Sequence, residues 1–141
     1  METNLSKLNE LFHLEEQDIR SYSPLTLAYI GDGVYELIIR TILVKKGNCP
    51  VNRLHKKASS LVKADSSVGN HEIIEKELTP EELSVYRRGR NAHSPTMAKH
   101  ATMADYRRAT GFEALMGYLY LKEEYTRMIT LIRMGIGEEI L

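Results

Sequence analysis

LTLAYIGDGVYELII, residues 25–39, is apolar at helical spacing but carries an aspartate, Asp32, between two glycines. A second run, ATGFEALMGYLYL at residues 109–121, has the same character and carries Glu113. Apolar residues at helical spacing in both runs predict two helices that are largely buried. A carboxylate on a buried helix needs a positively charged partner, a metal cation or a proton. The two runs therefore predict a helical fold with a pair of acids inside it.

The two acids can act together if their helices pack against each other. Two bare carboxylates about 4 Å apart repel by roughly 4 kcal/mol at an effective dielectric constant near 20. A divalent metal ion between Asp32 and Glu113 would remove this repulsion, so we predict that both are metal ligands. Gly31 and Gly33 weaken the helix around Asp32, and they allow another backbone, a ligand or a metal to approach closely. The alternative for Asp32 is a kinked helix in which its side chain is simply hydrogen-bonded.

Glu113 lies on a stripe of small residues, with Thr110 three positions before it and Gly117 four positions after it. Residues at these spacings share one helix face, so a second helix can meet that face closely. The alternative for Glu113 is an ion pair with an arginine, for which Arg107 and Arg108 are the candidates.

Two further acids are assigned supporting roles. Glu36 lies four residues after Asp32 and shares its face, so it could join a metal site through a water molecule. An ion pair with Arg40, four residues further on, is the more usual role for such a residue. Asp105 lies at the third position of a predicted helix, and we assign it to a capping box with Thr102.

The composition is that of a soluble, single-domain protein. A chain of 141 residues can bury roughly 70% of its unfolded surface in one domain. The single cysteine, Cys49, excludes an intrachain disulfide and favours a reducing cytoplasm. No secretion signal and no membrane span are recognisable. Strand signals are nearly absent, so we expect an all-α fold.

Capping signals place the helices. Ser23-Pro24 predicts the start of a long helix that ends near Gly47. Thr79 opens a second helix with a capping box, and Thr102 opens the helix that carries Glu113. Further helices are expected at about 5–14, 50–62, 64–77 and 123–134, an exposed loop at 92–101, and a division into an N-terminal extension, 1–22, and a catalytic domain, 23–141.

Charge is segregated along a chain whose net charge is zero. Residues 40–108 carry 14 Lys/Arg against 7 Asp/Glu, a net charge of +7, and the flanking segments together carry −7. A local basic surface can bind a polyanion even when the total charge cancels. Solvated helix faces or helix-dipole effects are the alternative explanation. We predict phosphate contacts by the basic clusters, namely Lys56, Lys57, Arg87, Arg88, Arg90, Asn91, Arg107 and Arg108.

Several of these segments resemble one known family in the same order. Residues 25–36 resemble the signature helix of ribonuclease III, in which a Gly-Asp supplies a metal-binding aspartate, and residues 112–121 resemble its second acidic motif. LHKKAS at 54–59, RGRNA at 88–92 and YRRATGFEAL at 106–115 are similar to the bacterial mini-ribonuclease III family, which lacks the double-stranded-RNA-binding domain. The similarity runs from about residue 24 to the end of the chain.

This resemblance implies a homodimeric, magnesium-dependent endoribonuclease of the ribonuclease III fold, with Asp32 and Glu113 as catalytic metal ligands. Mn²⁺ is expected to substitute for Mg²⁺. The implied substrate is double-stranded RNA, in particular the stem of the 23S ribosomal RNA precursor, whose two ends the family trims in the cytoplasm. Cleavage should leave a 5′-phosphate and a 3′-hydroxyl, and a ribosomal protein is a further candidate partner.

Two positions depart from the full-length enzymes. Their additional carboxylates would fall on Ala28 and Thr110, so only two of the usual four acids remain, and water can fill the missing metal-ligand positions. A rival hypothesis is a catalytically inactive ribonuclease III-like module that binds RNA or the ribosome. A third is a helical protein-interaction domain with no RNA role.

Overall fold

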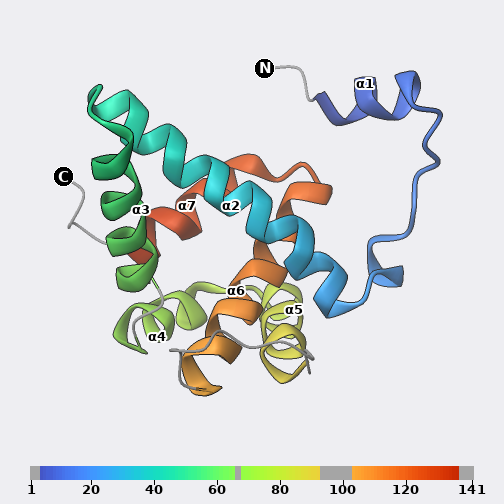
Figure 1. Cartoon of the computed structure of the whole chain (residues 1–141). Coiled ribbons are helices and arrows are strands. Elements are labelled where there is room, and N and C mark those ends of the chain that lie inside the picture. Colours follow the sequence, from blue (N-terminus) through green and yellow to red (C-terminus); the bar gives the residue numbers. More distant parts are fainter. Residues whose placement is uncertain (1–3, 66–67, 93–102, 137–141) are drawn as a thin grey trace.

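The computed structural model describes residues 4–65, 68–92 and 103–136, and every regular element within these ranges is helical. The expectation of an all-α fold is therefore confirmed. Figure 1 shows the elements in chain order. They are α1 (Asn4–Leu11), the short 3₁₀ helix η1 (Ile19–Ser21), α2 (Pro24–Lys46), α3 (Val51–Asp65), α4 (Val68–Glu77), α5 (Pro80–Asn91), α6 (Met103–Leu121) and α7 (Tyr125–Ile136).

The predicted caps account for two of the helix starts. The Ser23 hydroxyl accepts a hydrogen bond from the Thr26 amide at 3.2 Å, with Pro24 in the first turn of α2, and α2 ends at Gly47. The capping box of α5 is complete, because Thr79 and Glu82 each donate a backbone amide to the other's side chain, at 2.9 and 3.2 Å. The capping box predicted at Thr102 and the loop predicted at 92–101 lie almost entirely outside the described residues.

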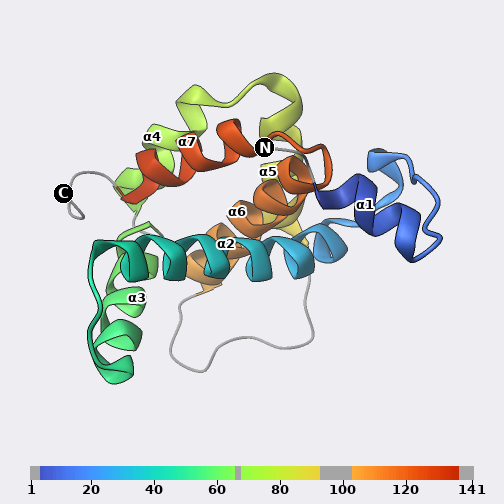
Figure 2. The same ribbon diagram turned by 90° about the horizontal axis from the view of Figure 1, so that it is seen from above.

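Helix α6 is the centre of the molecule. It crosses α2 on one side and packs along α5 on another, while α3, α4 and α7 complete the core (Figures 1 and 2). Most residues of its second half are buried. Leu115, Met116 and Leu119 of α6 are fully inaccessible to solvent and meet Ile39 of α2 and Ile132 of α7 in the same hydrophobic cluster. The core therefore holds α6 rigidly against the helix that carries Asp32.

Glycines let α2 and α6 cross with their backbones in contact. A Cβ atom on Gly31 would lie 1.7 Å from the carbonyl oxygen of Glu113, and one on Gly117 would lie 2.0 Å from the carbonyl oxygen of Leu27. No larger residue fits at either position without moving a backbone. The close approach predicted for Gly31 is thus confirmed. Gly33 faces the other way, and a Cβ there would meet nothing.

Helix α2 is buried on one face only, which corrects the expectation of a largely buried helix. Leu27, Tyr35 and Ile39 enter the core, but Tyr29 and Leu37 remain 83% and 65% exposed. The apolar pattern of α2 covers both faces, and the described residues supply a partner for only one of them. No helix in the described part of the chain is long and apolar enough to cross a membrane.

Candidate active site

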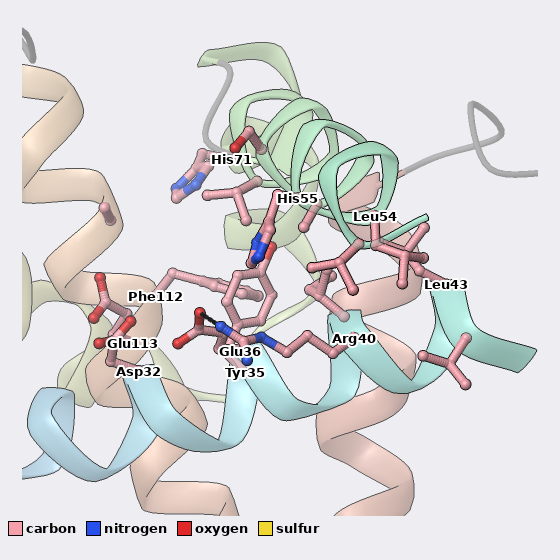
Figure 3. Close-up of a pocket in the computed structure, with 17 residues that line it drawn as sticks. Asp32, Tyr35, Glu36, Arg40, Leu43, Leu54, His55, His71, Phe112 and Glu113 are labelled. Carbon is pink, nitrogen blue, oxygen red and sulfur yellow. Dashed lines mark hydrogen bonds and ion pairs between the residues drawn. The ribbon is translucent and has the colours of Figure 1, made fainter. Parts of the chain in front are cut away.

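The crossing of α2 and α6 brings the two predicted acids together. Asp32 follows Gly31, the residue whose backbone touches the carbonyl oxygen of Glu113 itself. Figure 3 shows the two carboxylates side by side, one from each helix, at the end of a groove. The proximity of Asp32 and Glu113 was a sequence prediction, and the glycine contact is its structural cause.

The electrostatics of the pair are those of two acids that share a proton. Burial, the negative charge of Asp32 and a hydrogen bond with Asp32 raise the pKa of Glu113 from 4.5 to about 8. Burial raises a carboxyl pKa because it disfavours the charged form, and a neighbouring like charge acts in the same direction. Near neutral pH Glu113 is therefore mostly protonated.

The alternative explanation for Glu113, an ion pair with an arginine, does not apply among the described residues. Arg108 pairs with Asp105 rather than with Glu113, and no arginine contributes to the pKa shift of Glu113. Asp105 was assigned to capping, and its Thr102 partner lies outside the described residues. The pairing with Arg108 gives Asp105 a second role that the sequence pattern did not suggest.

The donor set fits a hard divalent cation. Carboxylate oxygens are the ligands that Mg²⁺ prefers, and Mg²⁺ retains several waters. The described residues contain no cluster of three or more His, Cys, Asp or Glu side chains that could hold a metal, so any ion bound here takes most of its ligands from water. Glu36 forms an ion pair with Arg40 at 2.6 Å, which is the role that sequence analysis considered the more usual one. Thr110 donates its hydroxyl to the Tyr106 carbonyl at 2.9 Å within α6.

A groove with a cavity of about 700 Å³ extends from the acid pair between α2 and α3. Its walls are mainly apolar side chains from both helices, and Figure 3 shows His55 and His71 above the pair. Tyr35 and Phe112 form its floor near the acids, in an edge-on contact with ring centroids 5.4 Å apart. The groove connects the acid pair to the outer end of α3.

A buried polar pair beside this groove was missed by sequence reasoning. His71 Nδ1 lies 2.8 Å from the Tyr86 hydroxyl, and both side chains are almost fully buried. Burial raises the pKa of Tyr86 to about 12. The only available signal was His71 three positions before the apolar Ile74 on one helix face, which does not identify a partner fifteen residues away.

A second glycine contact places the basic end of α5 beside the acid pair. A Cβ atom on Gly89 would lie 2.8 Å from the Ala114 Cβ, and one on Gly111 would lie 2.8 Å from the Tyr86 carbonyl oxygen. The glycine within RRGR is therefore needed for helix packing. It brings Arg87 and Arg88, both exposed, close to the turn of α6 that precedes Glu113.

The other predicted RNA contacts fall into two groups. Arg90 pairs with Glu75 at 3.2 Å and lies over the Tyr86 ring, so it also joins α5 to α4, whereas Arg108 pairs with Asp105 within α6. The remaining predicted contacts are exposed, and α3 carries two of them on positions that do not line the groove. These are Asn91, Arg107, Lys56 and Lys57.

Comparison with known proteins places this arrangement in a class. The family model described as Ribonuclease III domain matches residues 25–124, which include both acids and all three close-packing glycines of α6 and α2. A crystal structure of a Fusobacterium nucleatum protein superimposes with a TM-score of 0.76 at 29% identity, covering 89% of this chain and 96% of that one. The fold is that of a ribonuclease III domain.

Curated relatives narrow the class. Mini-ribonuclease 3 of Clostridium tetani is 48% identical over 123 residues, covering 86% of this chain and 82% of the relative. Mini-ribonuclease 3 of a Thermoanaerobacter species is 45% identical and covers 87% of each chain, and the Staphylococcus aureus relative of the same name is 38% identical over 84% of this chain and 90% of its own length. The chain belongs to the mini-ribonuclease III family.

Proposed function

We propose that this chain is a divalent-metal-dependent endoribonuclease that cleaves double-stranded RNA, with Mg²⁺ held by Asp32 and Glu113. The observation that carries the proposal is the pairing of two carboxylates at a glycine-lined helix crossing, where the pKa of Glu113 is raised to about 8. Packing alone gives no reason to hold two carboxyl groups together. Membership of an endoribonuclease family supports the same conclusion.

The chemistry proposed for the site is hydrolysis of a phosphodiester. A bound metal ion supplies positive charge at the scissile phosphate and an activated water for in-line attack. Asp32 and Glu113 would hold that ion from two neighbouring helices, and Glu113, whose pKa is raised to about 8, would have to be deprotonated to do so. We expect products with 5′-phosphate and 3′-hydroxyl ends, and Mn²⁺ should substitute for Mg²⁺.

Exposed cations would hold the RNA. Arg87 and Arg88 at the end of α5 and Arg107 at the start of α6 have exposed side chains, which could contact phosphates of an A-form duplex. An A-form duplex is recognised mostly by its backbone and its 2′-hydroxyls across the shallow minor groove. Lys56 and Lys57 extend the same positive surface along α3, and Asn91, Arg90 and Arg108 complete the proposed set.

A homodimer is part of the proposal, because each site would cut one strand of the duplex. The outer face of α2 supports a homodimer. Exposed Tyr29 and Leu37 lie on either side of Gly33, which has no side chain to keep a second helix at a distance. An apolar helix face of this kind calls for a partner. Sedimentation of the purified chain should give the mass of two copies.

The biological role we propose is processing of both ends of the 23S ribosomal RNA precursor in the cytoplasm. A ribosomal protein is a further proposed partner that shapes the substrate. These finer statements rest on the resemblance of the sequence to mini-ribonuclease III.

The test is cleavage of duplex RNA with Mg²⁺ by the wild type, by Asp32→Asn and by Glu113→Gln. Both substitutions should lower the cleavage rate by more than the roughly 10–100-fold loss that is typical of residues one shell outside a metal. Glu36→Gln is the matched control, because Glu36 is an acid in the same groove that is already paired with Arg40. If neither wild type nor variant cuts the RNA while both bind it, the chain is the inactive RNA-binding module.

A further inference from the structure

The N-terminal arm, residues 4–18, is the one described segment whose apolar side chains have no place in the core. Helix α1 carries Leu8 and Leu11 at a three-residue spacing, followed by Phe12, and Leu11 and Phe12 are 60% and 67% exposed. None of the described side chains of α1 is buried. Figures 1 and 2 show α1 at the end of a long connection to α2, on the opposite side of the molecule from α3. An exposed apolar cluster of this kind indicates an interaction surface.

The groove between α2 and α3 is an apolar surface that lacks a matching occupant within the described chain. Its outer part is lined by the apolar residues Leu43, Val44, Val51, Leu54 and Val62. Val44, Val51 and Val62 are exposed. An amphipathic helix that lays apolar residues at spacings of three and four into such a groove is a common mode of recognition.

The charges of the arm and of the groove region are complementary. Residues 4–18 contain one lysine and four acids, a net charge of 1 − 4 = −3, whereas residues 41–62 contain five Lys/Arg and no acid, a net charge of +5. Lys45 and Lys46 end α2 at the mouth of the groove, and Arg53 lies on the first turn of α3. Charges within a Debye length of about 8–10 Å attract at physiological salt.

The outer, apolar part of the groove lies beyond the reach of Phe12 on its own chain. Ile19 and Tyr22 pack against the core and fix the arm at the N-terminal end of α2. The segment from Phe12 to Ile19, fully extended, spans about 23 Å. Leu43, in the outer part of the groove, lies about 28 Å along α2 from Pro24 at 1.5 Å per residue.

We propose that α1 docks, through Leu8, Leu11 and Phe12, in the groove between α2 and α3 of a second copy of this chain. The contact adds an exchanged arm to the proposed homodimer and does not depend on RNA cleavage. The groove ends at Asp32 and Glu113, so the docked arm is a neighbour of the partner's acid pair.

The test is cross-linking between two distinguishable copies of the full chain in the absence of RNA. One copy, carrying a mass tag, has Cys49→Ser and a single new cysteine in the arm, at Leu8, Leu11 or Leu14 in three separate variants. The other copy is wild type, whose single cysteine, Cys49, lies between α2 and α3 at the mouth of the groove. A short bismaleimide joins thiols that lie close together without requiring disulfide geometry.

At least one arm variant should form the mixed covalent dimer at least about tenfold faster than a control. Docking raises the effective concentration of one thiol near the other from micromolar to millimolar. The matched control carries Thr130→Cys with Cys49→Ser, which places the thiol on the exposed face of α7. Val51→Asp in the wild-type copy should slow the arm reaction and leave the control reaction unchanged.

Rates equal to the control at all three arm positions overturn the proposal. Sedimentation mass and RNA cleavage, measured on the same proteins, distinguish a failure of the docked-arm proposal from a failure of the proposed function. A chain that is dimeric and cleaves RNA but does not cross-link through the arm disproves the docked arm alone. A chain that cross-links but leaves duplex RNA intact disproves the nuclease proposal alone.

Discussion

At the scale of single residues, Asp32 and Glu113 illustrate how a site can be built against its own electrostatics. Each residue alone has an ordinary structural explanation. Together, on two helices whose backbones touch, they form a pair in which one carboxyl has a pKa of about 8. A pair that must hold either a proton or a cation couples metal binding, pH and stability.

This coupling predicts an unusual pH dependence for the metal-free protein. Because the pKa of Glu113 is raised from 4.5 to about 8, the folded state binds more protons than the unfolded state between these values, and stability falls as pH rises through that window. Asp32→Asn removes the neighbouring charge, so this variant should unfold at a higher temperature than the wild type at pH 8 in EDTA. Thermal unfolding at pH 5 and pH 8 measures the effect.

Added Mg²⁺ should reverse the ranking, because an ion that binds only the folded wild type stabilises it by mass action. Glu36→Gln, at an exposed acid, should follow the wild type at both pH values. An identical fall of stability with pH in wild type and Asp32→Asn would contradict the coupled pair.

At the scale of helices, two glycines on one turn of α2 have opposite roles. The Cβ added by Gly31→Ala would lie 1.7 Å from a carbonyl oxygen of α6, so the two helices must separate. Overpacking of this kind typically costs about 1–3 kcal/mol or more. Gly33→Ala meets nothing within the chain and should raise stability by up to about 1 kcal/mol through helix propensity.

Urea unfolding of the two alanine variants gives the comparison. RNA cleavage should fall for Gly31→Ala, because separated helices also separate the two acids. If both variants unfold at the same urea concentration as the wild type, the backbone contact is not as tight as described.

A second helix-scale prediction concerns Arg127, which joins α7 to α5. Its guanidinium donates to both carboxylate oxygens of Glu82, at 2.8 and 2.9 Å, and to the Glu77 carbonyl at 2.7 Å. Arg127→Met leaves the buried Glu82 without its cation and should cost roughly 3 kcal/mol, the lower end of the range for a broken buried pair. Lys7→Met, which removes the exposed Lys7–Glu10 pair, should cost less than about 1 kcal/mol.

The same pair predicts an acid effect. Arg127 holds the pKa of Glu82 below 4.5, so its stabilisation is complete above pH 4.5 and is lost as pH falls through the lowered pKa. Unfolding free energies of Arg127→Met and wild type should therefore converge below pH 4. A difference that stays constant down to that pH would show that the pair does not contribute through charge.

At the scale of the whole molecule, our proposal assigns the binding of duplex RNA to exposed basic residues of this domain. Arg87→Gln with Arg88→Gln should weaken duplex RNA binding for all sequences alike. The double substitution should also make the slope of log K against log salt concentration less steep by about 2, because each phosphate contact releases roughly one counterion. Fluorescence anisotropy at several salt concentrations measures the slope. Arg20→Gln, at an exposed arginine paired with Asp18, should leave the slope unchanged.

The sequence alone determined the parts of this protein that depend on short-range interactions. Ser23, Thr79 and Gly47 mark helix ends through hydrogen bonds and backbone preferences within a few residues, so their effects can be read from local order. The all-α class follows from the same signals. The family motifs around Asp32 and Glu113 identified the acids, and their helical spacing indicated one face for each.

Only the tertiary structure decided which faces meet. Helical periodicity shows that a helix face is apolar. It does not show whether another part of the same chain or a second copy covers that face, as the outer face of α2 illustrates. The contact of Gly31 with the Glu113 backbone, the His71–Tyr86 pair and the ion pair that engages Arg90 each join residues from different helices. Such contacts arise because the core brings distant segments together, and no local pattern encodes the partner.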